Sequence, residues 1–101
     1  MTKERIVHID SQPRRRNGFE VYQNMTSAEP NISGENVYFV GVVANTDAEL
    51  PAAIDTLGRV RRIQPNAIIV LYTPKCDEAR LMFGSRVESL GATIFPIGYI
   101  K

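Results

Sequence analysis

Two short runs of the sequence decide the fold: Val37-Tyr38-Phe39-Val40-Gly41-Val42-Val43 and Ala67-Ile68-Ile69-Val70-Leu71-Tyr72. Both are almost continuously apolar and rich in β-branched and aromatic residues. That composition is typical of strands buried on both faces of a parallel sheet. A third strand of the same kind is predicted over residues 93–97.

The segments between these runs have helical spacing. Thr46 or Asp47 can cap the first helix, Thr46 and Glu49 fit a capping box, and Pro51 moves the true start a residue or two later. The second helix opens between residues 73 and 77 and ends at a glycine cap, Gly91. Its predicted inward positions are Ala79, Met82, Phe83, Val87 and Leu90. The alternation of strand and helix indicates a right-handed parallel βαβαβ unit over residues 37–101.

Residues 1–36 form an irregular N-terminal part of the same domain, which spans residues 1–101. A short strand around residues 6–9 is stopped by the turn residues of 10–13, and residues 19–22 alternate as a second short strand. The polar segment 24–36 is predicted to be a loop or a poorly formed helix.

Composition narrows the class of protein. A chain of 101 residues that is 44% apolar supports one core, and a net charge of +1 gives no field that attracts nucleic acid or anionic lipid. The single cysteine, Cys76, allows no internal disulfide, and no cluster of residues predicts a metal site. Because the longest apolar run is far too short to span a bilayer and no signal peptide is recognisable, we expect a soluble cytoplasmic protein.

The carboxyl ends of the strands, where parallel sheets place their sites, hold few chemical groups. We find no glycine-rich phosphate loop, nucleophile elbow or paired carboxylates, and therefore predict no catalytic residue, cofactor or metal. The only histidine, His8, is interpreted as a packing residue. Cys76 lies beside Lys75 near a helix start, which favours a reactive thiolate, although no histidine can be placed beside it. A small enzyme or ligand carrier that uses Cys76 and the strand ends is the alternative function.

Two surface features are candidates for binding. Arg14-Arg15-Arg16 can contact an acidic protein partner, and nucleic acid is the weaker reading of this triplet. The last strand has no covering helix after it, so an uncovered apolar face or an edge strand is a candidate interface. The residues of this interface are Phe95, Ile97, Tyr99 and Ile100.

Four segments resemble the receiver domains of bacterial response regulators. Residues Arg5-Ile6-Val7-His8-Ile9-Asp10-Ser11-Gln12-Pro13 look like the first receiver strand and its acidic turn, and Gly18-Phe19-Glu20-Val21 resembles the opening of the second. Residues 67–73 look like the fourth strand with its terminal hydroxyl residue, and residues 91–96 resemble the approach to the fifth. The resemblance implies a flavodoxin-like three-layer sandwich with a mostly parallel sheet, here with a short first helix and no last helix.

The chain departs from the receiver pattern at the positions that carry phosphorylation. Asp10 matches the first magnesium-binding acid, but Ser11 replaces the second, and Gly41 or a nearby apolar residue stands where the phosphoryl acceptor belongs. Thr73 (or Tyr72) is retained, whereas Ile97 or Gly98 stands near the position of the lysine. The resemblance therefore implies a phosphorylation-incompetent receiver in signal transduction. It would act as a non-catalytic module through dimerisation or a protein partner, with no role for a membrane.

Overall fold

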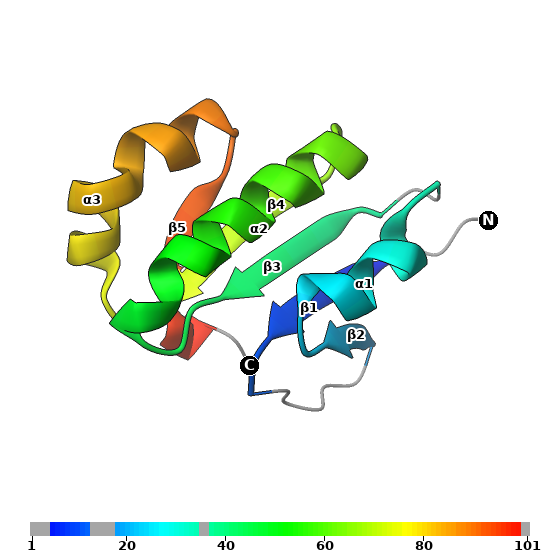
Figure 1. Cartoon of the computed structure of the whole chain (residues 1–101), viewed down its shortest axis with the longest axis horizontal. Helices are drawn as coiled ribbons and strands as arrows, with labels where there is room; N and C mark the ends of the chain where they lie inside the picture. Colours follow the sequence, from blue (N-terminus) through cyan, green and yellow to red (C-terminus); the bar gives the residue numbers. More distant parts are fainter. Residues whose placement is uncertain (1–4, 13–17, 35–36, 100–101) are drawn as a thin grey trace.

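The computed structural model describes residues 5–12, 18–34 and 37–99 of the chain (Figure 1). Its strands are β1 (Ile6–Asp10), β2 (Phe19–Tyr22), β3 (Phe39–Val43), β4 (Ile68–Thr73) and β5 (Thr93–Pro96). Its α-helices are α1 (Met25–Ile32), α2 (Leu50–Ile63) and α3 (Cys76–Ser89), and the two 3-10 helices are η1 (Asp47–Glu49) and η2 (Ile97–Tyr99).

The strands form one sheet in the order β2-β1-β3-β4-β5, and every neighbouring pair is parallel. This is the strand order of the flavodoxin-like fold, so the predicted α/β, flavodoxin-like class is confirmed. Both strands of the N-terminal part belong to the sheet, because β1 pairs with β2 on one side and with β3 on the other. The two N-terminal strands and the three strands of the βαβαβ unit therefore belong to one sheet.

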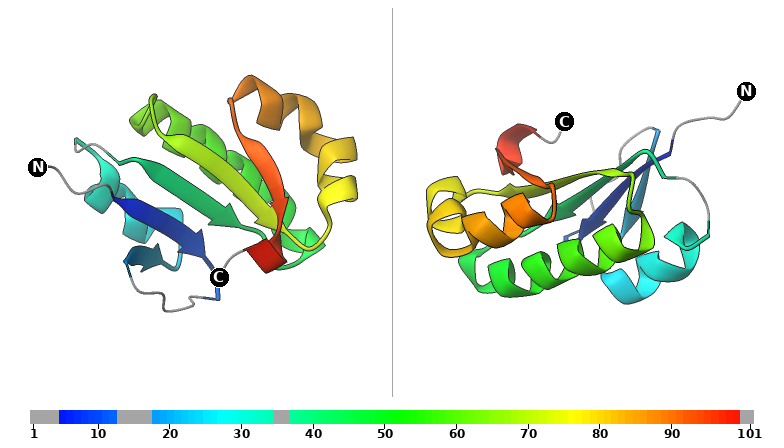
Figure 2. Two further views of the ribbon diagram at one scale, coloured as in Figure 1. Left: turned by 180° about the vertical axis from the view of Figure 1, so that it is seen from behind. Right: turned by 90° about the horizontal axis from the view of Figure 1, so that it is seen from above.

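The three α-helices cover one face of this sheet, and η2 lies on the other side (Figure 2). The connections from β2 to β3, β3 to β4 and β4 to β5 all step in the same direction across the sheet. Right-handed crossovers therefore place α1, α2 and α3 on the same face. The connection from β1 to β2 steps the other way. The predicted short first helix would lie in the connection from β1 to β2. Residues 13–17 of this connection lie outside the described part of the chain.

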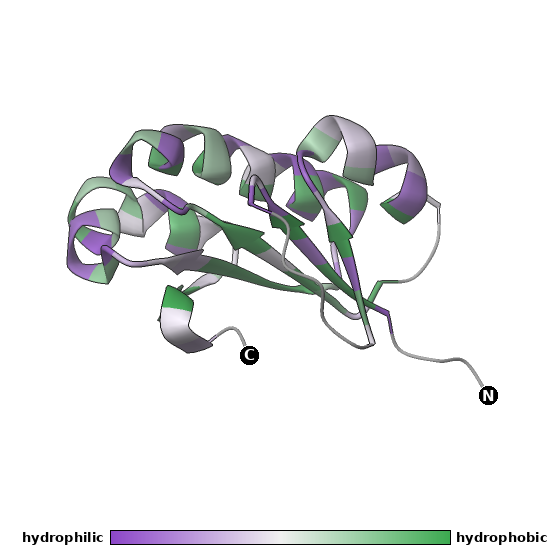
Figure 3. Cartoon of the chain, turned by 90° about the horizontal axis from the view of Figure 1, so that it is seen from below, coloured by the Kyte–Doolittle hydropathy of each residue, from purple (hydrophilic) through white to green (hydrophobic). Residues whose placement is uncertain are grey.

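Side chains alternate between the two faces of each strand. The helix-covered face carries aliphatic residues that pack against Ile54 and Leu57 of α2 in the main core. Its strand residues are Val7, Ile9, Val40, Val42, Ile69, Leu71 and Ile94. The opposite face, called here the open face, carries the alternate residues and is visible below the strands in Figure 3. Its residues are Ile6, His8, Phe19, Val21, Phe39, Gly41, Val43, Ile68, Val70, Tyr72, Thr93 and Phe95.

Helix α1 forms in the segment for which the sequence predicts a loop or a poorly formed helix. Asn24 caps it by accepting a hydrogen bond from the Ser27 N–H at 2.8 Å. Met25, Ala28 and Ile32 are buried at helical spacing, and this packing holds eight residues in a helix despite the internal Pro30.

The start of α2 corrects the predicted capping box. Helix α2 begins at Leu50 with Pro51 in its first turn, as the proline predicts. Thr46, however, makes no side-chain cap hydrogen bond. The Glu49 carboxylate instead accepts hydrogen bonds from the Ser11 hydroxyl at 2.8 Å and the Asn45 N–H at 3.4 Å. Glu49 therefore bonds to Ser11, which follows β1 and is distant in sequence, and not to Thr46.

Helix α3 differs from its prediction at one of the residues expected to point inward. Ala79 and Val87 are buried as predicted, and Phe83 and Leu90 are partly buried against the core. Met82 is 66% exposed, so its predicted inward position is wrong. Gly91 ends the helix at a φ of 71°, a left-handed conformation that glycine adopts without steric cost.

None of the helices in the described ranges combines the length and the apolar character that crossing a bilayer requires; α2 and α3 have 14 residues each.

Candidate functional site

The carboxyl ends of β1 and β3 meet at the point where the chain changes direction across the sheet, which is where sheets of this order place ligands. Asp10 ends β1 and is only 3% exposed. Its Oδ1 atom accepts hydrogen bonds from the Gln12 N–H at 2.9 Å and from the Asn45 amide at 2.8 Å. The sheet therefore holds this carboxylate between the loops that follow two neighbouring strands.

Ser11 belongs to the same polar cluster. Its hydroxyl donates to Glu49 Oε1 and accepts from the Asn45 amide at 3.2 Å. Asn45 therefore links Asp10 to Ser11, and Ser11 links this pair to the start of α2. Asp10 and Ser11, which are consecutive in the chain, thus belong to one polar cluster. Asn45 and Glu49 are additional members that sequence reasoning missed as site residues; Asn45 lies two residues after the end of β3.

The cluster satisfies itself with internal hydrogen bonds. In residues 5–12, 18–34 and 37–99, no group of three or more His, Cys, Asp or Glu side chains is arranged to hold a metal ion. A cavity of about 240 Å³ opens beside Ser11 and Glu49, between α1 and α2. Its walls are mostly apolar and include Ile9, Met25 and Ala53.

The other two candidate receiver positions, Gly41 and Thr73, have structural roles that differ from those of this cluster. Gly41 sits in the middle of β3, paired with His8 and Val70, two residues before the strand ends. Thr73 is fully buried at the end of β4, where its hydroxyl oxygen accepts a hydrogen bond from the Lys75 N–H at 3.1 Å. Thr73 therefore shapes the turn into α3.

Cys76 is the first residue of α3 and is partly buried against the main core. Its thiol donates to the Thr73 carbonyl oxygen at 3.5 Å. His8 points to the open face, on the other side of the sheet from that core. The structure thus leaves Cys76 without the histidine that a cysteine nucleophile uses as its base.

The predicted interface residues divide between exposed and packed positions. Phe95 and Tyr99 are 36% and 66% exposed, and their rings stack with centroids 5.7 Å apart. Ile97 belongs to η2 and packs, partly buried, against Val43, Val70 and Tyr72. The edge strand therefore ends at Pro96, because the chain turns into η2 and folds over the open face. Ile100 and the triplet Arg14-Arg15-Arg16 lie outside the described residues.

A continuous row of rings crosses the open face. It consists of Phe19, His8, Phe39, Tyr72, Phe95 and Tyr99 and is called here the aromatic row. His8 lies 5.0 Å from Phe19, 6.1 Å from Phe39 and 5.8 Å from Tyr72, measured between ring centroids. Tyr72 lies 6.4 Å from Phe95. These separations are those of interacting ring pairs, so the row extends from β2 to η2.

Gly41 makes the centre of this row possible. A Cβ atom at this position would lie 2.8 Å from Tyr72 Cε2 and 3.0 Å from His8 Cδ2. The first distance is shorter than real Cβ atoms show and the second is tighter than most of their contacts, so a side chain here would require the rings of Tyr72 and His8 to shift. His8 is 5% exposed and Tyr72 is 9% exposed as a result. Nothing in the sequence of β3 predicted this role, since it depends on residues of two neighbouring strands.

A cavity of about 260 Å³ opens in the aromatic row. It is lined by Ile6, His8, Phe19, Tyr38, Phe39, Tyr72 and Tyr99. Tyr38 and Tyr99 are about half or more exposed at its rim, with exposed fractions of 48% and 66%.

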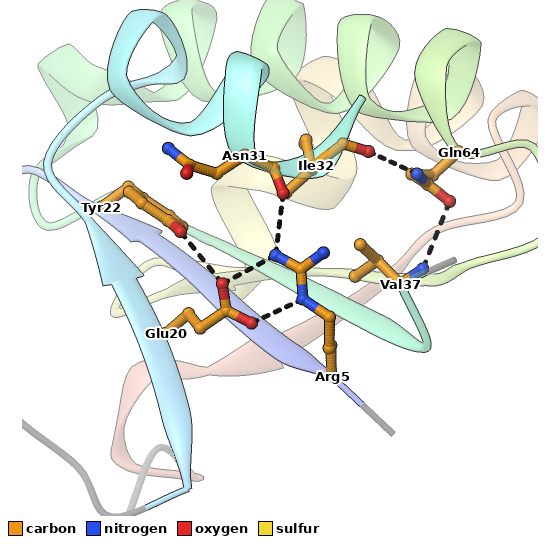
Figure 4. A network of polar contacts seen from close by, with 7 residues as sticks. All are labelled: Arg5, Glu20, Tyr22, Asn31, Ile32, Val37 and Gln64. Atoms are coloured by element: carbon orange, nitrogen blue, oxygen red, sulfur yellow. Dashed lines mark hydrogen bonds and ion pairs between the residues drawn. The ribbon is translucent and has the colours of Figure 1, made fainter. Parts of the chain in front are cut away.

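The amino ends of the strands carry a second polar network, shown in Figure 4. Arg5 donates to both carboxylate oxygens of Glu20 at 2.7 Å and to the Asn31 carbonyl oxygen at 2.8 Å. The Arg5 hydrogen bond holds the pKa of Glu20 below its usual value. Burial, together with the hydrogen bond to Glu20, raises the pKa of Tyr22.

Gln64 completes this end of the molecule. Its side chain donates to the Ile32 carbonyl oxygen at 2.5 Å and accepts from the Val37 N–H at 3.4 Å (Figure 4). These contacts tie the C-terminus of α1 and the start of β3 to the end of α2. Each of them satisfies a backbone group or a structural ion pair, so we assign this network to stability.

No protein-family model, curated protein or solved structure matches this chain.

Proposed function

We propose that this domain is a non-catalytic protein-interaction module that acts by associating through the open face of its sheet. One observation carries the proposal. All three described α-helices lie on one face of the sheet. The other face presents the aromatic row and an exposed margin that includes Ile68 and Phe95. Parallel sheets in α/β proteins are ordinarily covered on both faces. An apolar face without its own helices is therefore suited to cover by a partner.

The margin of the open face has the chemistry of an interface. Ile68 is 47% exposed and Phe95 is 36% exposed, and both side chains are uncharged and apolar. Protein interfaces are enriched in aromatic residues and depleted of charge at their centre. The open face offers this combination between β2 and η2.

The same domain is proposed to be a receiver-like module that cannot be phosphorylated. The strand order is that of the flavodoxin-like fold to which receivers belong. Asp10 is present, but its Oδ1 already accepts two hydrogen bonds, and β3 ends in Val42-Val43 followed by Ala44 without an acceptor carboxylate. Such a module signals by association alone.

The test compares association of three purified proteins: wild type, Ile68→Lys on the open face and Leu81→Lys on α3. Leu81 is 86% exposed and belongs to the helix-covered side, so it is the matched control. Self-association is measured by light scattering over a concentration series. Partner binding is measured by using each purified protein to capture binding proteins from a lysate of the organism that encodes the chain. We expect association to weaken at least about tenfold in Ile68→Lys, because burying an ammonium group in an apolar contact is unfavourable.

Leu81→Lys is expected to associate like the wild type. The proposal is wrong if the wild type binds neither itself nor another protein, or if both lysine variants lose association equally.

A further inference from the structure

The cavity beside Ser11 and Glu49 lies where the chain changes direction across the sheet. The chain passes from β1 outward to β2 and then returns across β1 to β3. Open α/β sheets bind ligands in the crevice at the carboxyl ends of the two strands that flank this point. The cavity, of about 240 Å³, is lined by residues from the ends of β1 and β3 and from the starts of α1 and α2. The place expected for a ligand and the observed cavity therefore coincide.

The inner wall of this cavity is apolar. It is formed by four buried side chains, between 2% and 6% exposed, which are Ile9, Met25, Val42 and Ala53. Water against such a wall finds few hydrogen-bond partners, so an apolar group that replaces it is favoured. At about 30 Å³ for each water in the liquid, the cavity has room for about eight waters, and a ligand of about eight to ten non-hydrogen atoms fills it. The wall therefore suits the apolar body of a small organic molecule.

Glu49 supplies the one charged group among the described residues that line the cavity. Its side chain is partly exposed, which places it at the mouth, where the hydroxyl and amide groups of Ser11, Gln23 and Asn24 are neutral. The Oε1 atom of Glu49 accepts hydrogen bonds from Ser11 and Asn45. Its Oε2 atom has no hydrogen-bond partner in the described part of the chain. An ammonium group can donate a charge-assisted hydrogen bond to this oxygen.

An anion is the alternative ligand, because the amino ends of α1 and α2 border the cavity and carry partial positive charge. Both ends are already served by side chains. Asn24 caps α1 by accepting a hydrogen bond from the Ser27 N–H at 2.8 Å. Glu49 directly precedes α2 and places its own negative charge at the amino end of that helix. A second anion would be repelled by the Glu49 carboxylate, so the observations favour a cation.

We propose that this cavity binds a small organic amine, with the ammonium group on Glu49 and the apolar body against Ile9, Met25 and Ala53. None of these four residues belongs to the open face, so the proposal does not rest on the proposed function. It assigns to the domain a small-molecule ligand that is defined by one positive charge and an apolar body.

Methionine methyl groups make the experiment site-specific. The chain has three methionines, of which Met25 lines the cavity and Met82, 66% exposed on α3, is an internal control. The full chain, isotope-labelled at its methionine methyl groups, is titrated with phenethylamine, phenethyl alcohol, phenylacetate and ethylamine. Its NMR signals are assigned with Met25→Leu and Met82→Leu.

Phenethylamine is expected to shift the Met25 signal saturably and to leave the Met82 signal in place. The alcohol has the same ring without the charge and should bind about fivefold to tenfold more weakly. Phenylacetate should bind more weakly still, because its carboxylate faces that of Glu49. Ethylamine lacks the apolar body and should bind at least about tenfold more weakly than phenethylamine.

Two variants locate the binding. Glu49→Gln keeps an acceptor oxygen for Ser11 but removes the charge, so it should weaken phenethylamine binding about fivefold to tenfold and leave the alcohol unchanged. Ala52→Leu narrows the cavity from an exposed position on α2 and should weaken both ligands. Ser85→Leu is the matched control at an exposed position on α3 and should change neither.

Several results would overturn the proposal. They are the absence of a saturable Met25 shift, equal binding of the amine and the alcohol by the wild type, and unchanged amine binding in Glu49→Gln. Tighter binding of phenylacetate would identify an anion site instead. Equal shifts of the Met25 and Met82 signals would show that the amine binds without a site. Ile68→Lys should bind phenethylamine like the wild type, so the amine site and association through the open face are tested separately.

Discussion

The two faces of the sheet are built from different residues for different purposes. The helix-covered face is aliphatic, and its strand residues interlock with Ile54 and Leu57 of α2. The open face is aromatic, contains His8 and depends on one glycine, Gly41, for its packing. The first arrangement buries its side chains in the main core, whereas the second leaves an exposed margin that includes Ile68 and Phe95. On the proposal that the open face binds a partner, the same strands carry the main core on one face and the recognition surface on the other.

The largest effect is expected on the helix-covered face. Leu57 is completely buried in α2, and Leu57→Ala removes several methyl and methylene groups from a packed core. We expect the free energy of unfolding to fall by about 2–5 kcal/mol, measured by chemical denaturation. Leu81→Ala, at a position 86% exposed, should change it by less than about 0.5 kcal/mol. A small effect at Leu57 would mean that the helices do not seal this face.

Gly41→Ala tests the packing of the open face. The added methyl group meets Tyr72 and His8 at distances that force the two rings apart, so we expect a loss of about 1–3 kcal/mol in the free energy of unfolding. Gly58→Ala in α2 is the matched control, because a Cβ there meets nothing within 4 Å. Alanine favours helix over glycine, so this control should gain up to about 1 kcal/mol. Equal effects at both glycines would contradict the account of the aromatic row.

A smaller effect is expected at the ion pair of Arg5 and Glu20, near the amino ends of β1 and β2. Arg5 lowers the pKa of Glu20 in the folded state, so their ion pair stabilises the protein above the ordinary glutamate value of 4.5 and is lost as pH falls below it. The pair is partly exposed, with side-chain exposures of 22% and 35%, so its contribution should be less than about 1 kcal/mol.

The measurement is the free energy of unfolding between pH 7 and pH 3 for wild type and Glu20→Gln. The variant should be less stable near pH 7 and should lose less stability on acidification. Parallel curves would show that the ion pair contributes nothing.

The smallest change in stability is predicted where the largest change in association is expected. Ile68→Lys places an ammonium group on the exposed margin of the open face, at a position 47% exposed. Its free energy of unfolding should stay within about 0.5 kcal/mol of the wild-type value. A large loss of stability, detected by the same denaturation series, would mean that Ile68 belongs to the packed part of the open face, with Val43, Val70 and Tyr72, and not to its exposed margin.

Local patterns predicted most of the fold. The apolar runs gave β3 and β4, and helical spacing with Pro51 and Gly91 located α2 and α3. A loop or a poorly formed helix was predicted for the α1 segment because most of its residues are polar. The helix is stabilised by the packing of its three buried residues, Met25, Ala28 and Ile32. Met82 was misplaced because α3 lies at the edge of the sheet, where β5 is its strand neighbour and only one side is covered.

The candidate site was predicted only in part. Asp10 and Ser11 are consecutive residues at the end of a predicted strand, so the sequence alone places them at the carboxyl edge of the sheet. The links through Asn45 and Glu49 depend on which strands are neighbours, which a single sequence does not specify. The aromatic row depends on the same information, because its rings come from different strands and meet only through the register of His8, Gly41 and Tyr72. Phe95 and Tyr99 were identified, and the cavity that Tyr99 borders was not.

The central claim is that the open face is the surface through which this domain associates. Photo-crosslinking tests it most directly, with p-benzoylphenylalanine in place of Ile68 on the open face and, separately, in place of Leu81 on α3. Each protein is expressed in the cells that encode the chain and is irradiated. We predict a discrete crosslinked product from position 68 and none from position 81. No product from position 68, or the same product from both positions, would contradict the account.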